Sequence, residues 1–297
     1  MVKASFVILN YNRKNELLAT VSKIKELVGN SGEFEIIAVD NNSADGTVAA
    51  MQEKFPDVVL IPRKVNNGIA GWNDGFAKAK GKYLAVLDDD SHLESGLNDA
   101  ISYLDNNPKI GILALRITGG VFETTDRTEW IDKKDSGGFI GCGAIIRKEL
   151  FEKIGGFAEW LHVYTHEYEY SLRCLDAGYK IIYFDGAHVV HRTSALNRTS
   201  KRLRIFSARN EMAIVYKYFG KSRYTYLFRI WLNNMKLIRK DGLKTAYYIT
   251  LAGIEFLKMR KKLKHTPVSE EAQNFLKKYL WSTHPLLSNL KKRFNYS

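Results

Sequence analysis

Short apolar runs alternate with amphipathic segments over the first 120 residues of the chain. Runs rich in β-branched residues, each the length of a strand, cover 5–9, 35–39, 58–61, 83–87 and 110–115. Between the first two, apolar residues in 15–28 recur at helical spacing. Strands that are apolar throughout and separated by helices predict an α/β fold, with a buried and mostly parallel sheet flanked by helices.

The pattern changes after Gly137. It predicts a strand over 139–146, helices over 148–154 and 167–177, and a last strand over 180–185 that is followed by His188 and His191. Beyond Arg192 the chain is helical, with helices predicted over 203–219, 224–238, 243–264 and 269–280. We therefore expect a sheet domain over 1–192 and an α-helical region over 193–297.

Charge divides the chain at the same place. Residues 1–191 hold 21 Lys and Arg against 27 Asp and Glu, whereas residues 192–297 hold 24 against 5, and the whole chain has a net charge of +13. The basic helices carry aromatic residues such as Trp231 and Tyr247, which is typical of helices that lie on an anionic membrane surface. The same pattern fits helices whose aromatic residues pack as the core of a structural subdomain. Nucleic acid is a disfavoured partner, because no nucleic-acid-binding motif is present.

The chain shows no sign of export or of a membrane span. Its first apolar run stops at Asn10, too early for a signal peptide, and no uncharged apolar stretch approaches the roughly 20 residues of a spanning helix. Only Cys142 and Cys174 occur, too few for a disulfide framework. We expect a cytoplasmic protein, with peripheral attachment to the membrane as one option.

Three adjacent carboxylates, Asp88 to Asp90, come directly after a predicted buried strand. Like charges this close repel one another, so a cation is expected to neutralise them, and hard oxygen ligands suit Mg²⁺ or Mn²⁺. The alternative is a solvated acidic turn that caps the next helix. Polar clusters at 10–13 and 40–47 follow two other strands, and the carboxyl ends of parallel strands meet at one edge of a sheet. All three clusters are therefore expected to converge.

A glycine-punctuated segment, 66–75, leads into another predicted helix and suits close approach of the backbone to a ligand. Neither a Walker A loop nor a full dinucleotide fingerprint is present, which argues against P-loop and NAD(P) chemistry.

In order along the chain, the segments 8–13, 39–47, 67–75 and 87–90 resemble the motifs of family 2 glycosyltransferases with the GT-A fold. The resemblance is nearest to the bacterial rhamnosyltransferase- and galactofuranosyltransferase-like branch, and Arg209-Asn210 also resembles a feature of that branch. The resemblance implies an inverting transfer from a UDP- or dTDP-linked sugar with Mn²⁺ or Mg²⁺. The implied acceptor is a polysaccharide or a lipid-linked saccharide of the cell surface.

Site residues follow from this resemblance position by position. Asp40 is expected to read the base, Asp88 to contact the ribose, and Asp90 with His191 to hold the metal. The nucleotide-binding residues implied are Asn10, Tyr11, Asn12, Asp40, Asn42, Asn67, Gly68, Asp88 and Asp89.

The Gly155-Gly156-Phe157 turn and the helix predicted after it resemble the second signature of the family. In this helix Glu167 stands where the family has its aspartate base, and Glu169 is the second candidate for the base. His166 replaces the acidic residue that precedes the base in the family. By itself, this helix also fits an exposed surface on which Glu169 pairs with Arg173. The residues expected around the donor or acceptor sugar are Gly141, Cys142, Gly143, Trp160 and His166.

Two other functions are alternatives to this interpretation. A sugar nucleotidyltransferase shares the layered α/β body, but it would need a glycine- and lysine-rich loop after the first strand. A degenerate, non-catalytic glycosyltransferase-like binding protein would explain the departures at His166 and Glu167.

Overall fold

The computed structural model describes residues 2–29, 31–119, 138–192 and 199–282. Its backbone separates into two units, one of residues 1–162 and 177–194 and the other of residues 163–176 and 195–297. The sequence predicts a single boundary after residue 192. In the structure, the segment 163–176 also groups with the C-terminal helices. We describe each unit by itself.

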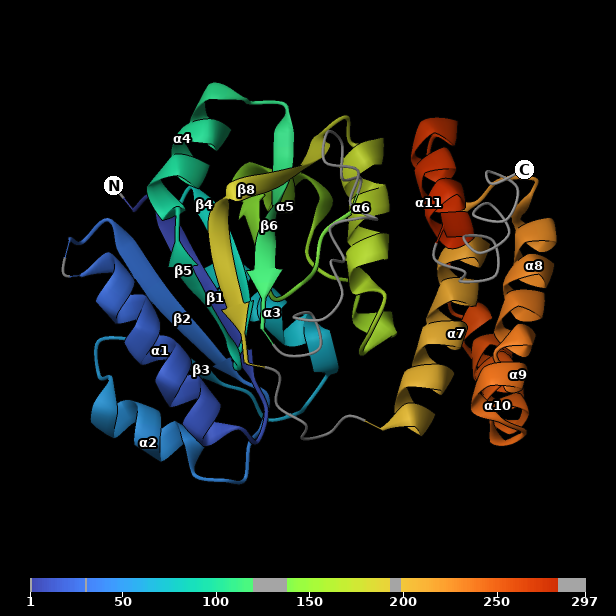
Figure 1. Cartoon of the computed structure of the whole chain (residues 1–297), viewed down its shortest axis with the longest axis horizontal. Helices are drawn as coiled ribbons and strands as arrows, with labels where there is room; N and C mark the ends of the chain where they lie inside the picture. The colour runs from blue at the N-terminus through green and yellow to red at the C-terminus, as the bar shows by residue number, and fades with distance from the viewer. Residues whose placement is uncertain (1, 30, 120–137, 193–198, 283–297) are drawn as a thin grey trace, which may run out of the picture. The chain divides into compact units, whose positions relative to one another are not determined.

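A mixed sheet forms the centre of the first unit, with the strand order β3-β2-β1-β4-β7-β6-β8-β5 among the described residues (Figure 1). Its strands are β1 (Ala4–Asn10), β2 (Phe34–Asp40), β3 (Val59–Pro62), β4 (Tyr83–Asp88), β5 (Ser91–Ser95), β6 (Ile110–Thr118), β7 (Ala144–Arg147) and β8 (Lys180–His191). The pairs β1–β2, β2–β3, β1–β4 and β6–β8 are parallel. The other pairs, β4–β7, β6–β7 and β5–β8, are antiparallel. The predicted α/β class is confirmed.

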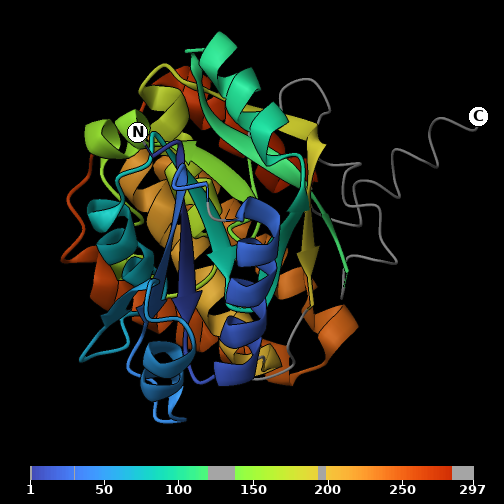
Figure 2. The same ribbon diagram turned by 90° about the vertical axis from the view of Figure 1, so that its left-hand side faces the viewer.

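Helices cover both faces of this sheet. Alternate residues of β1 point to opposite faces, so Phe6 and Ile8 pack in the core that α1 (Lys14–Val28), α2 (Thr47–Lys54) and α4 (Leu97–Asn106) cover. On the opposite face lie α3 (Gly71–Lys78) and α5 (Lys148–Ile154), joined by the Phe76–Phe151 ring contact. Figure 2 shows α1 lying along the sheet. The two layers of helices bury the strands, as the apolar runs predict.

The glycines of α3 serve packing against the sheet. A Cβ on Gly75 would lie 2.3 Å from Val7 Cγ1, and one on Gly71 would lie 2.4 Å from Leu9 Cδ1. The sequence predicts that the backbone of this segment lies close to a ligand. Gly71 and Gly75 instead bring the backbone of α3 close to β1.

Three strands differ from the sequence-based expectation. The segment Ser91–Ser95 has no apolar run, yet it forms β5 by pairing with β8, a partner far along the chain. The strand expected over 139–146 begins only at Ala144, where pairing with β4 and β6 starts. The last strand continues beyond residue 185, so His188 and His191 lie within β8 and do not follow it.

The second unit is helical. It contains α6 (His166–Asp176), α7 (Ser200–Tyr218), α8 (Arg223–Lys236), α9 (Ile238–Asp241), α10 (Lys244–Arg260) and α11 (Glu270–Ser282). Phe219, Ile249 and Phe256 are among its buried residues, while Phe228 and Tyr247 are each 60% exposed. The aromatic residues therefore divide between the core and the surface. None of the described helices is both long enough and apolar enough to cross a membrane.

Candidate active site

The polar clusters after β1, β2 and β4 meet at the carboxyl edge of the sheet. Asn10 stands opposite Asp40 in the β1–β2 pair, and Leu9 stands opposite Asp88 in the β1–β4 pair. Side chains then connect the clusters, because Asn10 Nδ2 donates a 2.8 Å hydrogen bond to Asp40 Oδ1. The parallel register brings together residues that are about 30 and 80 positions apart in the chain. This confirms the expected convergence.

Asp40 is the centre of the first part of the site. It is 1% exposed, and its second carboxylate oxygen accepts the Ser43 backbone N–H at 2.9 Å. A carboxylate has about four acceptor positions, so these two bonds leave capacity for another donor. Around it, Asn12 Oδ1 accepts the Ala44 N–H at 2.8 Å and fixes the loop after β2 against the loop after β1. Asn42 is exposed on that loop, with a left-handed backbone (φ 67°).

Asp45 stabilises the first turns of two helices. Its carboxylate accepts hydrogen bonds from the Lys14 N–H at 2.9 Å and the Thr47 N–H at 3.1 Å. Partial burial would raise the pKa of Asp45, but these bonds and one from the Thr47 hydroxyl lower it overall. The side chain therefore ties the beginnings of α1 and α2 together.

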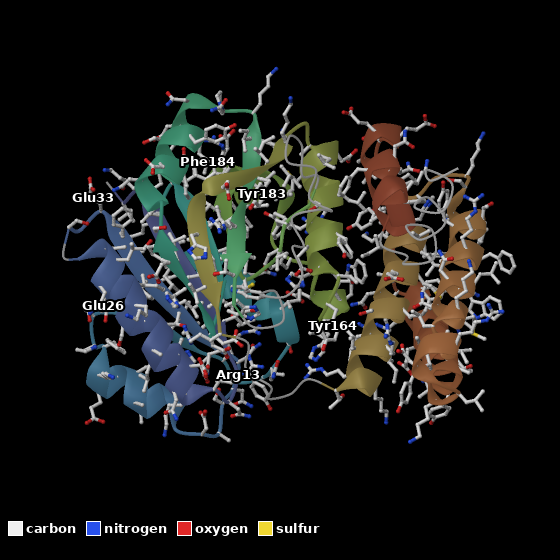
Figure 3. All side chains as sticks on the ribbon, viewed as in Figure 1. Arg13, Glu26, Glu33, Tyr164, Tyr183 and Phe184 are labelled. Carbon is white, nitrogen blue, oxygen red and sulfur yellow. The ribbon has the colours of Figure 1, made fainter. Side chains whose placement is uncertain are left out.

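The acidic turn after β4 is buried and contains an internal cation. Asp89 and Asp90 are 4% and 0% exposed, and Arg13 Nη1 lies 3.0 Å from Asp89 Oδ1 and 3.3 Å from Asp90 Oδ2. Figure 3 shows Arg13 at the end of the sheet where β1 stops. Burial raises the pKa of Asp89 to about 7, against the opposing effect of Arg13 and with the help of the Asp88 and Asp90 charges. The alternative of a solvated, helix-capping turn is therefore wrong, since the turn is buried and leads into β5.

His191, the last residue of β8, approaches the acidic turn at Asp90. His191 Nε2 lies 3.2 Å from Asp90 Oδ1, so the two predicted metal ligands are neighbours. Donor atoms of Asp88, Cys142 and His191 also lie within 4.8 Å of one another. Carboxylate and imidazole donors fit Mn²⁺ or Mg²⁺, whereas a thiolate favours softer cations. The donor set fits a divalent cation, and Cys142, expected near a sugar, belongs to this group.

Arg192 fixes the acidic turn from behind. Its backbone N–H donates to Asp90 O at 2.9 Å, and its Nη2 donates to Asp89 O at 3.2 Å and to the Thr20 hydroxyl at 2.7 Å. Its Nε also donates to Glu16 Oε2 at 2.8 Å. The turn, α1 and the end of β8 are thereby held as one polar cluster.

Gly68 is a tightly packed position in the loop before α3. Its φ is +66°, and a Cβ there would lie 1.7 Å from the carbonyl oxygen of His162. Asn41 Nδ2 donates to Gly68 O at 2.8 Å, which links this loop to the end of β2. Asn67 beside it is exposed. This loop therefore lies next to the Asp40 cluster.

Residues expected around the sugar fall into both units. Gly141, Cys142 and Gly143 are buried in the turn before β7, and Trp160 is half-buried on a short 3₁₀ helix, η4 (Glu159–Leu161), of the first unit. His166 belongs to the second unit, as do Glu167 and Glu169.

The two candidate bases on α6 have different surroundings within the second unit. Glu167 is half-buried, and its Oε2 lies 3.2 Å from His166 Nδ1. Glu169 is 1% exposed and accepts a bidentate pair of bonds from Arg173, at 2.8 and 2.7 Å, together with a bond from the Tyr218 hydroxyl. A carboxylate held by three donors is an anchor for the helix, so Glu167 is the better candidate base.

Sequence reasoning missed the roles of three residues. The sequence places Arg13 in a polar cluster but does not identify its carboxylate partners. It marks Arg192 only as the end of the first domain, and it gives Tyr218 no role beyond its place in a predicted helix. The triple carboxylate could have indicated the role of Arg13, because three adjacent negative charges require a nearby cation. Nothing in the sequence indicated that Tyr218 would reach Glu169.

Comparisons with known proteins agree on one class. Residues 5–155 match the family described as glycosyl transferase family 2. An uncharacterized glycosyltransferase of Haemophilus influenzae is 28% identical over 185 residues, which cover 58% of this chain and 61% of that protein. A poly(ribitol-phosphate) beta-glucosyltransferase of Bacillus spizizenii is 31% identical over 99 residues, covering 32% of this chain but only 16% of the relative. The matched regions thus span less than two thirds of either relative.

Solved structures give the same fold. A mannosyltransferase from Pyrobaculum calidifontis, in complex with GDP-Man and Mn²⁺, has a TM-score of 0.60 at 19% identity and covers 94% of this chain and 79% of its own. Residues 1–349 of S. aureus TarS give a TM-score of 0.61 at 14% identity, covering 89% and 83%. At these identities the likeness concerns the fold, and it confirms the GT-A architecture.

Proposed function

The chain belongs to glycosyl transferase family 2, and from this premise we propose that it moves a sugar from a UDP- or dTDP-linked donor to a saccharide acceptor with inversion. The observation that carries the proposal is the convergence of Asn10, Asp40 and the Asp88–Asp90 turn at one sheet edge, with His191 beside Asp90. Such an edge is where open α/β sheets bind their ligands. The rhamnosyltransferase-like branch is part of this proposal.

In this proposal the first unit binds the donor. Asp40 accepts the N3–H of uracil or thymine with its remaining acceptor capacity, and Asn10 and Asn12 hold the loops around the base. The ring of Tyr11, 36% exposed, is available to stack on the base. Asp88 accepts from a ribose hydroxyl. Asn42, Asn67 and Gly68 complete the nucleotide pocket.

Asp90 and His191 would hold Mn²⁺ or Mg²⁺, which supplies positive charge to the departing diphosphate. The chain's own residues prepare that place, since Arg13 neutralises part of the acidic turn and Arg192 fixes its backbone. Glu167 accepts the proton of the acceptor hydroxyl, and its Oε2 lies 3.2 Å from His166 Nδ1. The hydroxyl oxygen attacks the anomeric carbon from the face opposite the diphosphate, which inverts that carbon.

We further propose that the acceptor is lipid-linked and is met at the cytoplasmic face of an anionic membrane. The 29 residues from Met212 to Lys240 contain seven Lys and Arg and no Asp or Glu. Within them, α8 exposes Tyr224, Phe228, Trp231 and Leu232, which recur at helical spacing. Aromatic residues on one helix face among cations suit a membrane interface, where each cation near the surface adds about 1 kcal/mol.

The donor proposal is tested by a thermal-shift screen of UDP-, dTDP- and GDP-sugars with and without Mn²⁺. We expect stabilisation by a UDP- or dTDP-sugar that depends on the metal and is lost in Asp90→Ala. A response only to nucleoside triphosphates would favour a nucleotidyltransferase. The absence of metal-linked stabilisation by any diphosphate would favour a binding protein without catalysis.

The base assignment is tested by turnover with the donor found in that screen. Glu167→Gln should lower kcat by about 10²- to 10⁴-fold, the usual contribution of a positioned base, with donor binding intact. The matched control is Glu53→Gln, because Glu53 is an exposed glutamate of α2. This variant should behave as the wild type. Wild-type turnover in Glu167→Gln would refute the role of Glu167.

Membrane binding is tested by cosedimentation with phosphatidylcholine vesicles with and without phosphatidylglycerol. Binding should require the anionic lipid, weaken with salt and fall in Phe228→Ser/Trp231→Ser. It should persist in Val65→Ser, because Val65 is an apolar residue of the first unit that is as exposed as Phe228 but lies outside α8. Equal binding by the double variant would exclude the α8 face.

A further inference from the structure

The segment that leads into α6 has a backbone that non-glycine residues rarely adopt. Tyr164 and Thr165 have φ values of 63° and 60°, in the left-handed region. Such conformations are energetically unfavourable and persist only where surrounding contacts hold them, and a β-branched residue such as Thr is especially unfavourable there. Glu167 lies two residues beyond Thr165, in the first turn of α6. The direction of that first turn therefore depends on this strained pair.

Asn210 of α7 makes the contacts that hold the segment. Its Nδ2 donates to Val163 O at 2.8 Å and to Tyr164 O at 3.0 Å. The side chain is 0% exposed, so these bonds do not compete with water. Both amide hydrogens are thus used on consecutive carbonyls immediately before α6. All of these residues belong to the second unit, and Figure 3 labels Tyr164 beside the start of α6.

Arg209, the preceding residue, fixes which way the Asn210 amide points. Its Nε and Nη2 donate to Asn210 Oδ1 at 2.9 and 2.7 Å, and its guanidinium lies 4.5 Å from the centre of the Phe206 ring. A guanidinium has no acceptor, so Oδ1 must face Arg209 and Nδ2 must face the carbonyls. Arg209 and Asn210 therefore act as one unit that presents two donors to the α6 entry.

We propose that Asn210 is a positioning residue for the base, holding the left-handed turn at 164–165 so that Glu167 keeps its orientation in the first turn of α6. The assignment of Glu167 as base rests on the proposed function, whereas the support of the turn does not. Catalysis is sensitive to this support, because a misplacement of about 1 Å at a reacting group can cost on the order of a hundredfold in rate.

Hydrogen exchange tests the support of the turn without any activity. The Glu169 N–H donates to Thr165 O at 3.2 Å, so its exchange reports on the first turn of α6. Asn210→Asp keeps the shape and the pairing with Arg209 but removes both donors. It should speed exchange of the Glu169 amide by at least about tenfold, through local opening. Asn210→Ser, which keeps one donor, should give a smaller change.

The control is Asn234→Ala, which removes another side-chain donor of the same unit, bonded to Ile230 O at 3.0 Å and to Glu211 Oε2 at 3.2 Å. It should leave exchange at Glu169 unchanged. Unchanged exchange in Asn210→Asp would overturn the proposal. If Asn210→Asp fails to fold, the Asn210→Ser measurement decides in the same way.

A kinetic double-mutant cycle then tests the action through Glu167. Asn210→Ser should lower kcat on the order of tenfold, with little change in the donor KM, while Asn234→Ala should not. In the Glu167→Gln background the same substitution should have little further effect, because the group that it positions is gone. An equal loss of kcat in both backgrounds would show a merely structural role and overturn the proposal. Full activity of Glu167→Gln would instead refute the proposed base, leaving the exchange result to stand alone.

Discussion

The ion pair between Glu169 and Arg173 should contribute far more to stability than its spacing suggests. On an exposed helix, an i,i+4 pair contributes about 0.3–0.5 kcal/mol. Here the pair is bidentate, at 2.8 and 2.7 Å, and the side chain of Glu169 is 1% exposed. Although burial alone would lower it, the charge and hydrogen bonds of Glu169 hold the pKa of Arg173 above its ordinary value. Burial and the Glu169 charge together raise the pKa of Tyr218.

The perturbation is Arg173→Met, which keeps the length of the side chain and removes its charge. It leaves a buried carboxylate with the Tyr218 hydroxyl in place of three donors, and breaking a buried pair in this way costs about 3–5 kcal/mol. Tyr218→Phe removes one hydrogen bond to a charged group and should cost about 1.5–3 kcal/mol. The double variant Glu169→Gln/Arg173→Met should be more stable than Arg173→Met, because no charge is left buried.

Urea unfolding followed by circular dichroism measures these differences. Lys258→Met is the control, since Lys258 pairs with Glu255 at 2.7 Å on the surface of the same unit, with the two side chains 68% and 47% exposed. Its loss should cost less than about 0.5 kcal/mol. A cost for Arg173→Met as small as that of the control, or a double variant less stable than Arg173→Met, would refute the anchor role of Glu169.

Three further predictions address other parts of the chain. Gly68→Ala should lower the free energy of unfolding by at least about 2 kcal/mol, because the added Cβ would meet the His162 carbonyl oxygen. Gly220→Ala is the control, because nothing lies near its Cβ, and it should change the free energy of unfolding by no more than about 0.5 kcal/mol. Thermal unfolding measures both changes. Cys142→Ser should weaken binding of Cd²⁺ by about tenfold and of Mn²⁺ less, measured by calorimetry with the metals alone, because the thiol is the soft donor of its group. Burial raises the pKa of Glu211 from 4.5 to about 7. The folded state then binds a proton that the unfolded state releases, so stability should fall as the pH rises between these values, by at most about 3 kcal/mol. Glu211→Gln should reduce this slope in urea midpoints at pH 5 and pH 8 and leave the part that comes from Asp89, whose pKa is also raised to about 7. A slope as steep as that of the wild type would contradict the assignment.

The α/β class and the place of the site could be predicted from the sequence because both depend on local patterns. Apolar runs of strand length identify β1, β2 and β4, and residues directly after parallel strands must meet at one edge. The helices α1 and α5 began within one residue of their predicted starts, since their apolar spacing is helical. β5 could not be found this way, because its polar sequence forms a strand only through its pairing with β8.

By itself, the sequence determined which chemical groups stand at the ends of which strands: Asn10 at the end of β1, Asp40 at the end of β2 and the triple carboxylate beginning at the end of β4. Only the tertiary structure decided how their charges are balanced. Arg13 is 76 residues from Asp89 along the chain, and Tyr218 is 49 residues from Glu169, so no local pattern joins either pair. Burial then sets the strength of these contacts, because charges removed from water interact strongly only with the partners that the fold supplies. For the same reason, two glutamates two positions apart on α6, Glu167 and Glu169, have become a candidate base and a helix anchor.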